Sequence, residues 1–162
     1  MRLTRRETLA AAPAEVYATL TDPQFQKAKC AATHATSHEV DVVETGVGHR
    51  VRATRVLPSD DLPDVARSFV GDSLTVVETY DWGAAAADGS REAVVDLHVK
   101  GAPLTLKGTL RLTAEGGGTT ETLDAELKAN VPFVGGKIEQ AASGPIGEAV
   151  DVELRMLRER LG

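Results

Sequence analysis

Hydrophobic and polar residues alternate along much of this chain, and the alternation predicts a sheet with one buried face. It is clearest over residues 103–113, where leucines take every second position on one face and Thr, Lys and Arg take the other. Successive side chains of a strand point to opposite faces, so the leucine face must be covered. The same reasoning predicts strands over residues 3–10, from 33 to the turn at 45–48, and over 49–57, 74–82, 91–99, 103–113 and 119–129.

Helical spacing replaces the alternation near both ends of the chain. A proline-led start at residues 11–15 and the break at Thr21-Asp22-Pro23 predict two short helices after the first strand. Residues 65–70 suggest a further short turn of helix, and residues 134–161 predict a long terminal helix. The Gly144-Pro145 pair inside that helix is expected to break or kink it, because proline removes a backbone donor. Helices clustered around a run of strands indicate an α+β fold.

Composition narrows the class of protein. The 162 residues are 42% hydrophobic and 26% charged, as in ordinary globular proteins, and are expected to form a single domain over residues 1–162. The net charge is −6 and no basic stripe is present, so nucleic acid is not expected as a partner. No apolar run reaches the ~20 residues of a membrane span, and Cys30 is the only cysteine. We therefore expect a cytoplasmic protein without stable membrane insertion.

Four segments carry a resemblance to a known group of proteins. Residues 12–23 (APAEVYATLTDP) resemble the entry segment of the START-like or SRPBCC superfamily, in which an aromatic residue follows Val and the helix ends in Asp-Pro. Residues 57–63, 76–82 and 131–139 look more narrowly like a bacterial family of uncharacterised proteins within it. The resemblance implies a helix-grip fold, in which a curved seven-stranded antiparallel sheet wraps around the long C-terminal helix. In relatives, a cavity between sheet and helix holds lipids, sterols, polyketides or quinones.

A cavity of this kind needs apolar walls with a few polar groups that orient the ligand. The inward strand positions and the stripe of the terminal helix supply candidates for those walls. Our first hypothesis is therefore a non-enzymatic carrier or sensor for a small hydrophobic or amphipathic molecule. The predicted lining residues are Val40, Val51, Val76, Glu78, Tyr80, Trp82, Leu106, Leu110, Leu127, Ile146 and Val150.

Glu78 shares its strand face with Val76, Tyr80 and Trp82, which would place a carboxylate in an apolar wall. Its pKa would then be raised unless an inward Arg55 or His49 pairs with it, or unless it lies at an open edge. A second hypothesis is a cofactor-free cyclase or dehydratase that uses Glu78 or His38 as acid or base. A third is an interaction module with a vestigial cavity.

No metal or cofactor site is predicted. His34 and His38 are four residues apart, a spacing that suits a metal on a helix, but on the predicted strand they would lie ~13 Å apart. The segment Val134-Gly135-Gly136-Lys137-Ile138 lacks the Ser or Thr that follows Lys in a phosphate-binding loop. Cys30 has no accompanying motif for nucleophilic catalysis and is interpreted as a small core residue.

Overall fold

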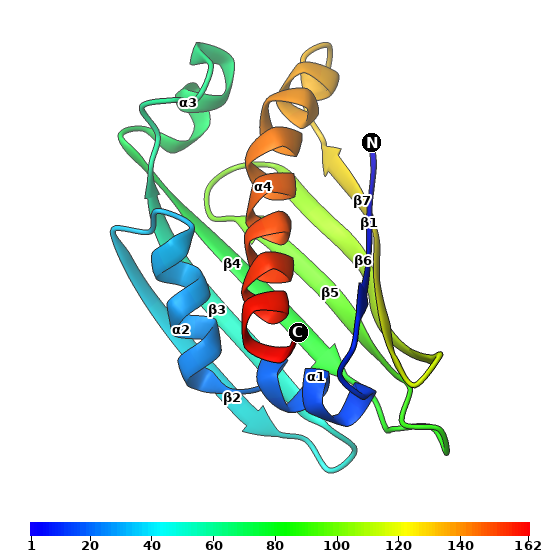
Figure 1. Ribbon diagram of the computed structural model, residues 1–162. Helices are drawn as coiled ribbons and strands as arrows, with labels where there is room; N and C mark the ends of the chain where they lie inside the picture. The colour runs from blue at the N-terminus through cyan, green and yellow to red at the C-terminus, as the bar shows by residue number, and fades with distance from the viewer.

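The computed structural model describes residues 1–162, which form an antiparallel sheet of seven strands and four helices (Figure 1). The predicted α+β helix-grip arrangement is confirmed, including the two short helices after the first strand. The strands are β1 (Arg2–Leu9), β2 (Ser37–Glu44), β3 (His49–Pro58), β4 (Ser73–Trp82), β5 (Arg91–Val99), β6 (Leu104–Glu115) and β7 (Gly118–Ala129). The helices are α1 (Pro13–Leu20), α2 (Pro23–Ala32), α3 (Asp64–Val70) and α4 (Gly135–Leu161).

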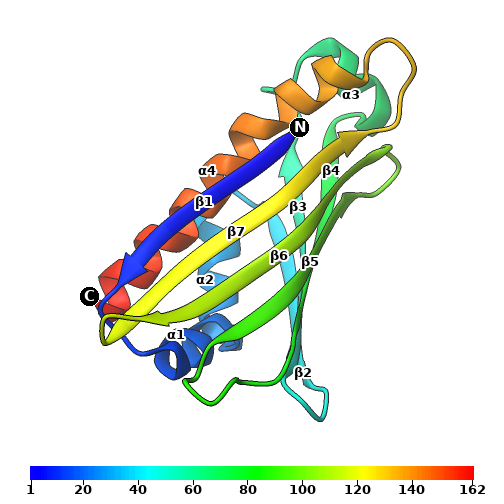
Figure 2. The same ribbon diagram turned by 90° about the vertical axis from the view of Figure 1, so that its right-hand side faces the viewer.

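The strands pair in the order β1-β7-β6-β5-β4-β3-β2. Consecutive strands from β2 to β7 are neighbours, whereas β1 pairs with β7 at the far edge, from Arg2 opposite Glu126 to Leu9 opposite Thr119. The first two strands of the chain are therefore the two edges of the sheet, and α1 and α2 span the distance between them. The sheet curves around α4, as the side view shows (Figure 2).

Register aligns the apolar positions of neighbouring strands into one continuous face. Leu106 lies opposite Leu127, and Leu110 lies opposite Leu123. All four leucines are buried, whereas Lys107 and Arg111 on the other face are exposed. The apolar positions of the alternation that predicted these strands thus form the face of the sheet that lines the core.

Gly108 is the inward position between Leu106 and Leu110. A Cβ atom there would lie 2.1 Å from the backbone oxygen of Asp124 and 2.5 Å from Cα of Ala125. Because no side chain fits at that distance, glycine at position 108 allows β7 to approach β6 closely.

Helix α4 runs unbroken from Gly135 to Leu161 through Pro145, so a break at Gly144-Pro145 is wrong, whereas the alternative, a kink within one continuous helix, stays a prediction. Pro145 lacks one N–H donor, but apolar residues pack against the core on both sides of it. Ile138 precedes it and Leu154 and Leu157 follow it, and all three are buried. Packing at both ends outweighs the loss of a single backbone hydrogen bond.

The three shorter helices pack around α4 and the inner face of the sheet. Helix α1 contacts β6, β7 and α4, whereas α3 contacts α4 at the opposite end of the sheet (Figure 1). Helix α2 is capped at its N-terminus by Asp22, whose side chain accepts a hydrogen bond from the backbone N–H of Gln24. The helix covers β2 and β3. None of the helices has the length and apolar character needed to cross a membrane.

The strand predicted from residue 33 begins only at Ser37. His34 has a positive φ of 66° and lies in the connection after α2, so it does not share a strand with His38. The alternation of residue types happens to continue through the polar residues of this connection. The alternation alone therefore could not reveal the turn before Ser37.

Candidate functional site

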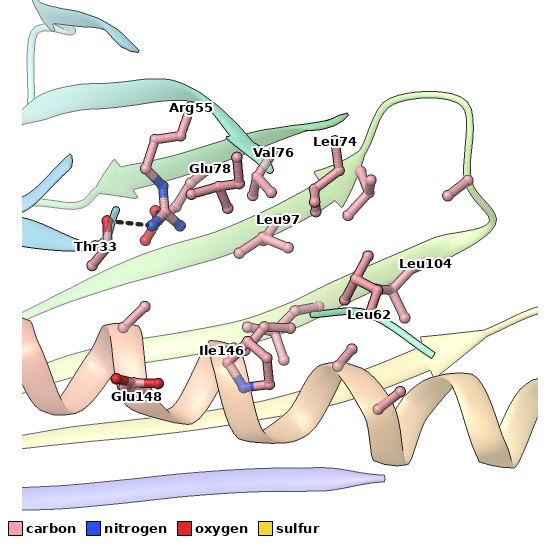
Figure 3. Close-up of a pocket in the computed structure, with 18 of the residues that line it drawn as sticks. Thr33, Arg55, Leu62, Leu74, Val76, Glu78, Leu97, Leu104, Ile146 and Glu148 are labelled. Carbon is pink, nitrogen blue, oxygen red and sulfur yellow. Dashed lines mark hydrogen bonds and ion pairs between the residues drawn. The ribbon is translucent and has the colours of Figure 1, made fainter. Parts of the chain in front are cut away.

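A cavity of about 410 Å³ lies between α4 and the inner face of the sheet. It occupies the α3 end, because α3, the turn before β6 and the first half of α4 all contribute to its lining. Of the 33 lining residues, 23 are hydrophobic, so most of the wall offers only apolar contacts. Figure 3 shows Leu62, Leu74 and Leu104 toward one end and Thr33, Arg55 and Glu78 grouped at the other.

Glu78 on β4 is the centre of this polar end. Its Oε1 accepts hydrogen bonds from Lys29 Nζ of α2 at 3.0 Å and from the hydroxyl of Tyr80. Its Oε2 lies 3.3 Å from Nη2 of Arg55 on β3, and Nη1 of Arg55 donates to Oγ1 of Thr33 at 2.8 Å. The partnership with Arg55 is one of those that the sequence suggested for Glu78.

The partners determine the charge state of each group. Burial alone would raise the pKa of Glu78, but the charges of Lys29 and Arg55 and the hydrogen bond from Tyr80 hold that pKa at about 2. Burial would likewise lower the pKa of Lys29, yet Glu153 and Glu78 raise it well above its usual range. Burial and the charge of Glu78 raise the pKa of Tyr80. At neutral pH, Glu78 is a carboxylate, Lys29 an ammonium and Tyr80 a neutral phenol.

Two further carboxyl groups lie behind this end. Glu153 Oε2 on α4 accepts a hydrogen bond from Lys29 Nζ at 2.6 Å, so Lys29 joins α2, β4 and α4. Glu121 on β7 is buried, and its Oε2 has no hydrogen-bond partner. Burial raises the pKa of Glu121 well above its usual range, and the negative charge of Glu153 raises it further. Arg55 Nε is also buried without a partner.

The predicted lining residues fall into two groups. Six of them line the cavity, from β4, β6 and α4: Val76, Glu78, Tyr80, Leu106, Ile146 and Val150. The other five, Val40, Val51, Trp82, Leu110 and Leu127, do not line it.

The α1 end of the sheet is filled by packed side chains. Trp82 and Leu110 belong to this packed end and therefore do not line the cavity. The indole of Trp82 packs edge-on against the ring of Tyr17 from α1, with centroids 5.4 Å apart, and the guanidinium of Arg91 lies 3.7 Å from the centroid of Tyr17. Leu110 lies in the same row across the sheet as Trp82, through Ala93, so it belongs to this packed end.

The remaining three residues are kept out of the cavity lining by the elements that pack around them. Val51 lies opposite Tyr80 but is almost completely buried and faces no cavity. Leu127 is on β7, which α4 contacts directly, and Val40 is on the edge strand β2 under α2. Alternation identified the correct face in each strand but not how far along the sheet the cavity extends.

The structure adds two charged residues that the sequence analysis missed. Lys29 follows Phe25 by one helical turn, and both are buried. Glu153 lies three residues after Val150 and four before Leu157, on the apolar side of α4. A charged residue on the apolar side of an amphipathic helix was the signal available for both.

The other candidate residues lie outside the polar end or on its margin. His38 is exposed on the edge strand β2 and does not line the cavity, whereas His34 is exposed and touches the cavity lining. Cys30 is buried, as predicted, and burial raises the pKa of its thiol. No group of three or more His, Cys, Asp or Glu side chains is arranged to hold a metal ion.

The curved sheet, the long helix across it and the cavity between them define the helix-grip fold. Residues 4–161 match the family described as protein of unknown function (DUF2505), and the chain belongs to that family. An uncharacterized protein of Mycobacterium tuberculosis is 25% identical over 149 residues, which are 87% of this chain and 85% of that protein.

Solved structures share the fold at low sequence identity. A STAR-related lipid transfer protein from Xanthomonas axonopodis superposes with a TM-score of 0.64 at 16% identity, covering 99% of this chain and 85% of that one. The ZhuI aromatase/cyclase of a Streptomyces species gives 0.57 at 12% identity, covering 99% and 93%. A START superfamily protein of Mycobacterium smegmatis gives 0.59 at 11% identity, covering 99% and 96%. These likenesses show the fold alone.

Proposed function

We propose that this protein binds a small hydrophobic or amphipathic molecule between the sheet and α4, and acts as a carrier or sensor without transforming it. The observation that carries the proposal is the cavity of about 410 Å³ with its predominantly apolar wall. Its volume lies within the range of small-molecule sites in proteins, about 300–1,000 Å³. The lipid transfer protein among the structural neighbours supports the same class of ligand.

The acid–base alternative has less support from the geometry. His38 lies outside the cavity, and Glu78, with a pKa of about 2, is a weak base. Each oxygen of Glu78 already faces a buried cation. The arrangement stabilises a fixed ion pair rather than a group that exchanges protons with a ligand. A vestigial cavity is disfavoured because the space is not filled by side chains.

The test is ligand capture with and without a filled cavity. Native mass spectrometry of gently purified protein should show a bound small molecule, and Ala142→Phe should abolish it, because Ala142 lines the cavity from α4. Ala18→Phe is the matched control, since Ala18 is exposed on α1 and outside the lining. Equal adduct occupancy in both variants, or no binding of any apolar probe by the wild-type protein, would refute the proposal.

A further inference from the structure

The charged groups of the cavity are distributed unevenly, and their distribution bears on the ligand. Five charged residues contribute to the lining, with histidine counted as neutral: Lys29, Arg55, Glu78, Asp61 and Glu148. Two of these are cations and three are anions. The two cations are buried at the polar end, and no other lysine or arginine reaches the cavity.

Both cations are already neutralised within the protein. Lys29 lies between Glu78 and Glu153, at 3.0 and 2.6 Å, and Arg55 lies 3.3 Å from Glu78. The four groups Lys29, Arg55, Glu78 and Glu153 therefore sum to no net charge. Arg55 Nε has no partner, but it is buried beneath neighbouring atoms and does not face the cavity space. An anionic ligand would find no uncompensated positive charge there, and burying an unpaired charge is unfavourable.

The acids of the lining are placed differently. Asp61 precedes α3 and Glu148 is on α4, and both are exposed while also contributing to the cavity wall. Each marks a place where the cavity wall reaches solvent. Figure 3 shows Glu148 on α4 opposite Arg55 and Glu78, whereas Leu62, the neighbour of Asp61, lies toward the other end of the cavity. Ionised carboxylates accept hydrogen bonds and donate none, so each of these acidic margins of the cavity favours a hydrogen-bond donor and repels an acid.

We infer that the ligand is an uncharged or cationic amphiphile: an apolar body inside the cavity, with a hydroxyl or amino group toward an exposed acid of the wall, Asp61 or Glu148, and not a carboxylic or phosphoric acid. This inference rests on the proposed function and specifies the chemical class of the ligand at that site. The apolar wall selects for the body of the molecule, and the charge distribution selects against a negative end group.

Three ligands with the same chain but different end groups test the inference at pH 8: dodecanol, dodecylamine and dodecanoate. Each is used to displace the neutral fluorescent probe N-phenyl-1-naphthylamine from the wild-type protein. Dodecanol and dodecylamine should compete at concentrations about tenfold or more below that of dodecanoate, because only dodecanoate brings an anion to an acidic margin. Dodecanoate that competes as well as dodecanol would overturn the inference.

A charge reversal at one of these margins gives the second arm. Glu148→Lys should improve competition by dodecanoate and weaken that by dodecylamine, each by about two- to fivefold. It should change competition by dodecanol less than either, because a hydroxyl can donate to a carboxylate and can also accept from an ammonium. Glu159→Lys makes the same change of charge on the same helix outside the cavity and should alter none of the three. Equal effects of both variants would overturn the inference. A wild-type protein that fails to bind the probe would instead refute the proposed function itself.

Discussion

Replacing Lys29 tests most directly whether the ion pairs at the polar end of the cavity stabilise the fold. Its side chain is 4% exposed, and its ammonium group touches two carboxylates that are themselves only 7% and 4% exposed. Lys29→Met keeps much of the side-chain volume but removes the charge. Glu78 would retain Arg55, whereas Glu153 would lose its only ion-pair partner while still buried.

The expected loss is large because a buried charge is left without compensation. Removal of one member of a buried ion pair destabilises a protein by about 3–5 kcal/mol. At about 2–4 °C per kcal/mol for a domain of this size, the melting temperature should fall by roughly 6–20 °C. Chemical denaturation followed by far-ultraviolet circular dichroism measures the free energy, and differential scanning calorimetry measures the temperature.

Two companion variants separate charge from packing. Lys27→Met changes an exposed lysine of the same helix that forms no ion pair, so its effect on the free energy of unfolding should stay within about 0.5 kcal/mol. Lys29→Met combined with Glu153→Met removes the stranded carboxylate as well and should recover more than half of the loss. A Lys29→Met protein within about 1 kcal/mol of the wild type, or a double variant less stable than the single one, would refute this reasoning.

Three further predictions concern other groups. The pKa of Glu78 is lowered to about 2, so ionisation of Glu78 adds about 3 kcal/mol to the free energy of unfolding above pH 4.5. This contribution is lost as the pH falls from 4.5 toward 2. When the free energy of unfolding is measured over this range, it should therefore decline less in Glu78→Gln than in the wild type. The pKa of Glu121 is raised, so its contribution to the free energy of unfolding is present at low pH and is lost as the pH rises through its folded-state pKa. Glu121→Gln should therefore stabilise the protein at pH 8 by about 1–2 kcal/mol in urea denaturation. No gain in stability would contradict the raised pKa. Pro145→Ala restores a donor inside α4 and should raise the free energy of unfolding by about 1–3 kcal/mol, whereas a lower melting temperature would show that Pro145 is needed for packing.

The fold was predictable because its main signals are periodic. The leucines of β6 define a buried face by themselves, and the stripe of Ile146, Val150, Leu154, Leu157 and Leu161 defines the side of α4 that meets it. Such patterns report which way a side chain points. They do not report position along an element, which is why Trp82 and Leu110 were assigned to a cavity that ends before reaching them.

The polar end was predicted only in part for a related reason. Glu78 and Arg55 stand on adjacent strands, where alternation places both on the inner face, and their pairing was foreseen as one option. Lys29 and Glu153 come from helices whose distance from Glu78 depends on how they pack against the sheet. Each appears in the sequence as an isolated charge on an apolar side, and only the three-dimensional arrangement joins them.

The pairing of β1 with β7 has a consequence for how the chain is made. Thr119, the partner of Leu9, follows it by more than a hundred residues. At a synthesis rate of 5–20 residues per second, β1 leaves the ribosome roughly 5–20 s before its partner strand exists. During that interval it is an unpaired strand, and Arg2, Arg5, Arg6 and Glu7 along it are the kind of charged side chains that discourage pairing with other chains. The same long sequence separation between β1 and β7 also predicts slow refolding of the complete chain in vitro, because contacts between distant segments form slowly.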